Sequence, residues 1–104
     1  MKTVMLVCAA GMSTSLLVTK MRRAAHAKGL DITIFAVSAT EIDDVLETRK
    51  VDALLLGPQV KFRREEIEAR LQGENILLDE INIQHYGMMD GEKVLQQALS
   101  LVGS

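Results

Sequence analysis

Four short apolar runs, each bounded by turn-forming residues, are spaced along the chain and predict β-strands. They occupy residues 3–7, 32–37, 51–56 and 76–78. Each run is rich in β-branched or aliphatic residues, and turn signals such as Gly29 and the Gly57-Pro58 pair separate them. Runs of this length and composition are typical of strands buried inside an α/β protein.

The segments between these runs carry apolar residues at helical spacing. In residues 14–28 the apolar stripe consists of Leu17, Met21, Ala24 and Ala25. Further helices are expected from residue 40 onward, over residues 63–71, and over residues 90–102 with Asp90 as the N-cap. The alternating order of strands and helices predicts an α/β fold, in which an open four-stranded parallel sheet carries helices on both faces.

Composition limits the domain count and the function class. A length of 104 residues suits one domain spanning residues 1–104, and a hydrophobic content of 48% fits strands covered on both faces. The net charge of −2 and the aromatic content of 3% give no support for nucleic-acid binding. Because the apolar runs are too short to span a bilayer, we expect no membrane insertion. We also expect no signal peptide, because Lys2 is followed by a strand-like run that ends in a turn.

Cysteine and histidine usage limits the redox and metal chemistry. A single cysteine excludes an internal disulfide and favours the cytoplasm. Neither His26 nor His85 has a second ligand at metal-binding spacing, so the sequence predicts neither a metal site nor a cofactor. We expect a monomer.

The candidate site is the segment that links the first strand to the first helix, CAAGMSTS. A thiol at a strand end, a glycine and three consecutive hydroxyl residues could form an anion cradle, because the N-terminus of a helix presents unpaired amides to an anion. Parallel sheets also bind ligands at the carboxyl ends of their strands. The alternative is that Cys8 is an inert, buried hydrophobic residue.

Known phosphate-binding loops fit this segment poorly. The sequence contains neither GxxxxGK[ST] nor GxGxxG. Low-molecular-weight cysteine phosphatases share the strand-loop-helix design, but they place an arginine six positions after the cysteine, where this chain has Thr14. Without that guanidinium the loop lacks a bidentate clamp for the transition state of hydrolysis.

The segment CAAGMSTSLLVTKM resembles the active-site segment of the IIB proteins of the bacterial sugar phosphotransferase system, in the lactose/cellobiose (chitobiose) family. The similarity continues in LLLGPQV, residues 54–60, and YGMMDGEKVL, residues 86–95, and covers essentially the whole chain. The resemblance implies the strand order 2-1-3-4.

The resemblance also implies a function as a phosphoryl carrier. Cys8 would accept a phosphoryl group from a phosphohistidine of a IIA protein and pass it to a disaccharide of the cellobiose, chitobiose or lactose type, held by the membrane permease IIC. The phosphate cradle would consist of Ala9, Ala10, Gly11, Met12, Ser13, Thr14 and Ser15.

Several assignments stay open. Pro58, Gln59 and Tyr86 could face a partner, or they could belong to a strand-ending turn and to the core. The basic residues of the first helix could form a docking patch or a solvated face. Two rival functions remain: a hydrolase of the cysteine-phosphatase or arsenate-reductase type, and a non-catalytic anion-binding module.

Overall fold

The computed structural model describes residues 2–9 and 12–103. Its strands are β1 (Lys2–Cys8), β2 (Ile32–Ser38), β3 (Ala53–Leu56) and β4 (Leu77–Glu80). Its α-helices are α1 (Met12–Ala27), α2 (Ile42–Thr48), α3 (Arg64–Leu71), α4 (Ile83–Gly87) and α5 (Gly91–Val102). Two 3₁₀ segments, η1 (Ala39–Glu41) and η2 (Pro58–Arg63), precede α2 and α3.

The described strands form one parallel sheet of order β2-β1-β3-β4, which confirms the expected α/β fold and strand order. β1 is central, with its residues Val4 to Val7 paired to both β2 and β3. All the strands therefore end at one edge of the sheet, where the expected site lies.

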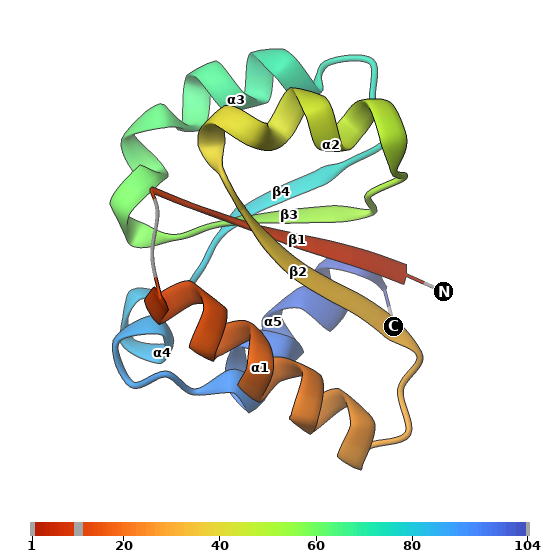
Figure 1. Ribbon diagram of the computed structural model, residues 1–104, viewed down its shortest axis with the longest axis vertical. Helices are drawn as coiled ribbons and strands as arrows, with labels where there is room; N and C mark the ends of the chain where they lie inside the picture. The colour runs from red at the N-terminus through yellow and green to blue at the C-terminus, as the bar shows by residue number, and fades with distance from the viewer. Residues whose placement is uncertain (1, 10–11, 104) are drawn as a thin grey trace.

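Helices cover both faces of the sheet (Figure 1). On one face, Val4 and Leu6 of β1 pack into a cluster with buried residues of α1 and α5. On the other face, Met5 and Val7 pack with buried residues of α2 and α3. The strict alternation along β1 explains why its sequence is apolar at every position from 4 to 7, since both faces of the strand are buried.

Some boundaries differ from the sequence prediction. The first helix begins at Met12 rather than at residue 14, and the fourth strand is displaced toward the polar pair Asp79-Glu80. Asp90 caps α5 as predicted, because its Oδ1 accepts a hydrogen bond from the Lys93 amide at 3.1 Å. The short helix α4 was not predicted, because five residues carry too little periodicity to detect.

Helices α1 and α5 approach each other closely at Gly91. A Cβ atom built on Gly91 would lie 2.5 Å from Lys20 Cβ and 2.8 Å from the Met21 backbone nitrogen. Only glycine fits at this contact. Among the described helices, none has an apolar stretch long enough to cross a membrane.

Candidate functional site

Cys8 is the last residue of β1, and its thiol lies at the carboxyl edge of the sheet. The residue is 7% exposed, and its Sγ–H donates to the carbonyl oxygen of Val37 at 3.6 Å. By the alternation of the strand, its side chain belongs to the same face as Val4 and Leu6, which is the face that α1 covers. The thiol is therefore buried at the end of the strand, although the residue belongs to neither of the two hydrophobic clusters that flank the sheet.

Helix α1 begins at Met12, four residues after the end of β1, and lies on one face of the sheet (Figure 1). The first amides of a helix have no partner within the helix, so this end presents unpaired N–H groups and the positive end of the helix dipole. Of the expected cradle residues, Ala9 and Ser15 are exposed. Ala10 and Gly11 lie outside the described residues, as do the side chains of Met12 and Ser13.

Thr14 points into the protein. It is 3% exposed, and its Oγ1 lies 3.2 Å from the phenol oxygen of Tyr86. The threonine that replaces the arginine of the phosphatases thus directs its hydroxyl toward a tyrosine of α4, so that its part in an anion cradle is limited to the backbone amide.

The loop after β3 lies beside the end of β1, as the strand order implied. The Gly57 amide donates to the Val7 carbonyl at 2.8 Å. Pro58 is half-buried and opens η2, whereas Gln59 is exposed and its Nε2 donates to the Tyr86 phenol oxygen at 3.0 Å. Tyr86 itself is 9% exposed, so its ring belongs to the core and only its hydroxyl reaches the site.

A carboxylate is bound to the end of β2, the strand that pairs with β1 along its whole length. Ser38 is the β2 residue paired with Cys8, and its amide and hydroxyl donate to the same Glu41 oxygen at 3.0 and 2.9 Å. The hydrogen bond from the Ser38 amide, reinforced by that from its hydroxyl, holds the pKa of Glu41 below its ordinary value. Sequence reasoning missed this pair, although Ser followed three residues later by Glu is a known signature of a helix start.

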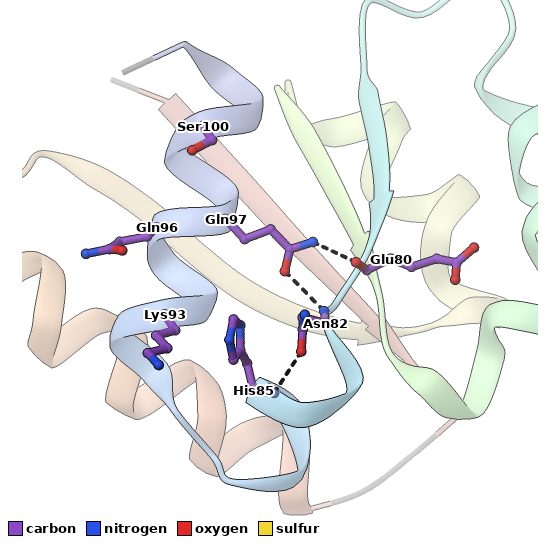
Figure 2. A pocket seen from close by; sticks show the side chains of 7 residues that line it. All are labelled: Glu80, Asn82, His85, Lys93, Gln96, Gln97 and Ser100. Atoms are coloured by element: carbon purple, nitrogen blue, oxygen red, sulfur yellow. Dashed lines mark hydrogen bonds between the residues drawn. The ribbon is translucent and has the colours of Figure 1, made fainter.

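A polar hollow lies between α4 and α5 (Figure 2). Gln97 spans it: its Nε2 donates to the Glu80 carbonyl at 2.6 Å and to Asp79 Oδ2 at 3.0 Å, and its Oε1 accepts from the Asn82 amide at 3.1 Å. The Asn82 side chain in turn caps α4 by accepting from the His85 amide at 3.1 Å. These bonds fasten α4, and with it Tyr86, to the end of β4 and to α5.

His85 lines this hollow and joins the hydrogen-bonded set through its backbone amide (Figure 2). In the described part of the chain, His85 Nδ1 is a buried atom without a hydrogen-bond partner, and His26 is exposed in the last turn of α1. Three metal-binding side chains do not converge anywhere within the ranges 2–9 and 12–103. The basic residues of the first helix and the turn after it are all exposed at residues 22, 23 and 28; of these, Arg22 donates to the Ile34 carbonyl at 2.7 Å, and Lys28, just after α1, pairs with Glu92.

Large apolar side chains are exposed on the elements around the site. They are Leu16 of α1, Phe62 of η2, Ile83 of α4 and Met88 just after α4. The sequence left open whether Met88 and Met89 form contact surface or core. The structure divides them: Met88 is 73% exposed, and Met89 packs against the core.

Comparison with known proteins now adds to this geometry. Residues 3–97 match the family described as the lactose/cellobiose-specific IIB subunit of the PTS system. The chain belongs to this family. As a IIB component of the lactose/cellobiose type, the protein has a role in sugar transport by the phosphotransferase system, in which IIB components are phosphotransferase domains that work with IIA and IIC partners.

Curated relatives cover nearly the whole IIB chain. It is 48% identical over 104 residues to the galactose-specific EIIB component of Lactococcus lactis subsp. cremoris (strain MG1363), with 97% of this chain and 96% of the relative covered. Identity and coverage are the same for the cellobiose-specific EIIB component of Lactococcus lactis subsp. lactis (strain IL1403). Identity is 43% over 102 residues, with 98% and 97% covered, for the oligo-beta-mannoside-specific EIIB component of Bacillus subtilis (strain 168).

Solved structures agree with the fold. The cellobiose-specific IIB component of Borrelia burgdorferi superposes with a TM-score of 0.78 at 37% identity, covering 98% of this chain and 92% of that chain. The lactose-specific IIB domain of Streptococcus pneumoniae gives a TM-score of 0.84 with 96% of each chain covered; at 18% identity this likeness concerns the fold alone.

Proposed function

We propose that the protein is a phosphoryl carrier in which Cys8 forms a phosphocysteine. The Cys8 thiolate attacks the phosphorus of a IIA phosphohistidine. An S–P bond forms, the N–P bond breaks, and the imidazole leaves with the electron pair. A sugar hydroxyl then attacks the phosphocysteine, so that an O–P bond forms, the S–P bond breaks, and the hydroxyl proton passes to a base outside this chain.

The position of Cys8 is the observation that carries this proposal. The only cysteine of the chain ends the central strand, on the face covered by α1, and that helix begins four residues later at Met12. Backbone amides and a helix dipole hold a phosphoryl group without a guanidinium, and so they favour a carrier that releases the group over an enzyme that hydrolyses it. The proposed cradle comprises residues 9–15, with Thr14 contributing its amide.

The partners of the proposed relay follow from the family. A IIA phosphohistidine protein would donate the phosphoryl group, and a membrane IIC permease would present a disaccharide of the cellobiose, chitobiose or lactose type. The exposed Leu16, Ile83 and Met88 support a docking face for proteins around the site. We place the carrier in the cytoplasm, as a monomer and a single domain of residues 1–104.

The test is incubation with a phosphorylated IIA protein of a lactose/cellobiose-type system, followed by mass spectrometry. The parent should gain one phosphoryl group on Cys8, and Cys8→Ser should remain folded and gain none, because the serine hydroxyl is a far weaker nucleophile near neutral pH. Labelling of another residue, such as His85, would overturn the assignment. Release of inorganic phosphate would instead indicate the hydrolase, and an unmodified parent that still binds phosphate would indicate the anion-binding module.

A further inference from the structure

One phenol oxygen joins three segments that are distant in sequence. Tyr86 OH lies 3.2 Å from Thr14 Oγ1 in the first turn of α1 and accepts from Gln59 Nε2 in η2 at 3.0 Å. The Thr14–Tyr86 contact is buried. Because Gln59 Nε2 can only donate, the phenol oxygen is the acceptor in that bond, whereas either hydroxyl can be the donor in the Thr14–Tyr86 bond.

The phenol is held in place both by the packing of its ring and by the anchoring of its helix. Its ring packs in the cluster formed by β1, α1 and α5. Its helix, α4, is fastened by the Asn82 cap and by Gln97. A polar group this well enclosed is costly to leave unpaired, so the hydrogen bond to Thr14 resists any rotation of the first turn of α1.

That first turn supplies the amides that the proposed cradle uses. The position of these amides relative to the Cys8 sulfur depends on how the start of the helix is held. A donor that is displaced by about 1 Å stabilises a transition state much less well. Thr14 and Tyr86 need not touch the phosphoryl group to affect its transfer.

We propose that Tyr86 and Thr14 are positioning residues, which seat the first turn of α1 against Cys8 and so set the rate of phosphoryl acceptance. This inference rests on the proposed phosphocysteine function. Gln59 is the exposed end of the same chain of hydrogen bonds, and it stabilises the phenol from the side of the β3 loop.

The test compares Tyr86→Phe, Thr14→Val and the double variant with the parent. Each substitution removes a hydroxyl and preserves most of the side-chain volume. The measurement is the rate of phosphoryl transfer from a phosphorylated IIA protein, as a function of IIA concentration, by rapid quench. We expect each single variant to lose kcat by about 10- to 100-fold with little change in KM, as misplacement of a catalytic group does. The double variant should be no slower than the slower single variant, because both changes break one interaction.

Two further variants separate positioning from loss of stability. Thr14→Ser keeps the hydroxyl and should restore most of the parent rate. Thr48→Val removes an exposed hydroxyl that bonds within α2, at 3.3 Å to the Val45 carbonyl, and should transfer at the parent rate. If Thr14→Ser were as slow as Thr14→Val, or if Thr48→Val were slowed equally, the positioning role would be excluded.

A measurement that needs no partner distinguishes this inference from the function on which it rests. Backbone NMR order parameters of Thr14 and Ser15 should fall in Tyr86→Phe and stay at parent values in Thr48→Val. If the parent took no phosphoryl group, the proposed function would fail while a fall in order would still show that the phenol seats the turn. Unchanged order together with unchanged transfer in Tyr86→Phe would overturn the inference.

Discussion

Gly91 at the start of α5 lies directly against the backbone of Lys20 in α1. A Cβ atom on Gly91 would stand 2.7 Å from the Lys20 carbonyl carbon, closer than side chains and backbone approach one another in folded proteins. The neighbouring residues Val94 and Leu95 are fully buried in the same interface, so neither helix is free to move away.

Gly91→Ala should therefore destabilise the fold. The methyl group meets backbone atoms of a helix, which shift less readily than the end of a flexible side chain, and overpacking of this kind costs about 1–3 kcal/mol. Urea unfolding followed by circular dichroism measures the change. Gly87→Ala is the matched control, because a Cβ there meets no atom within 4 Å, and alanine is the better helix former. Equal stability of the Gly91→Ala variant and the parent would show that α5 can slide along α1.

Asp90 should contribute to stability as the N-cap of α5. Replacing it by alanine leaves the Lys93 amide without the Oδ1 acceptor and is expected to cost about 1 kcal/mol. Asp90→Asn retains an acceptor oxygen at the same place and should recover most of the loss. If Asp90→Asn were as unstable as Asp90→Ala, the charge of Asp90, rather than its hydrogen bond, would be what stabilises the helix start.

Gln97 should contribute to the stability of the fold through its hydrogen bonds across the hollow between α4 and α5. Gln97→Ala leaves the Glu80 carbonyl and the Asn82 amide without their side-chain partner, for an expected loss of about 1–3 kcal/mol in the free energy of unfolding. The adjacent Gln96 is exposed and points away from this network (Figure 2), so Gln96→Ala is the control and should change stability little. If both variants lost the same stability, the loss would come from changing any exposed side chain of α5 and not from the hydrogen bonds of Gln97.

Glu66 should give a pH-dependent contribution to stability. Hydrogen bonds from Arg63, with the charge of Arg63 and then of Arg70, hold the pKa of Glu66 below its ordinary value of 4.5. Because the folded pKa is the lower one, the contribution is present above pH 4.5 and is lost as the pH falls through the folded value. The stability difference between the parent and Glu66→Gln should thus shrink from about pH 6 to about pH 3.

This difference should also shrink in salt, since the Glu66 side chain is exposed. Glu65→Gln is the matched control: it removes one charge from the same helix, and the described residues offer Glu65 no ion pair. A pH-independent difference for Glu66→Gln would exclude the carboxylate as its source.

The order of the strands along the chain and the two-faced burial of β1 could be predicted because apolar runs and helical stripes are local properties of the sequence. The inward direction of the Thr14 side chain was harder to predict. A hydroxyl inside CAAGMSTS suggests a ligand contact, yet the helix begins at Met12, and Thr14 then continues the inward stripe of Leu17, Val18 and Met21 by one turn. Extending that period backward would have placed Thr14 inside.

The contact between Thr14 and Tyr86 could not be predicted from the residues alone. It joins positions separated by 72 residues, and it depends on a helix of five residues that is set by tertiary contacts. The Asn82 cap can be read from the sequence only once the end of β4 is known. The hydrogen bonds of Gln97 form only when α5 is packed against the end of β4. Local patterns specify elements; the hydrogen bonds between elements come from the assembled fold.

Tyr86 is the only tyrosine of a chain that has no tryptophan. Its hydroxyl bonds to Gln59 and Thr14 at the edge of the candidate site, so the tyrosine fluorescence of the whole protein originates from one phenol at that edge. Emission from tyrosine is sensitive to the hydrogen bonding of the hydroxyl and to nearby charge. The parent protein thus carries its own optical reporter of the candidate site, and we expect the proposed transfer of a phosphoryl group to Cys8 to change this emission, so that no label is needed to follow it.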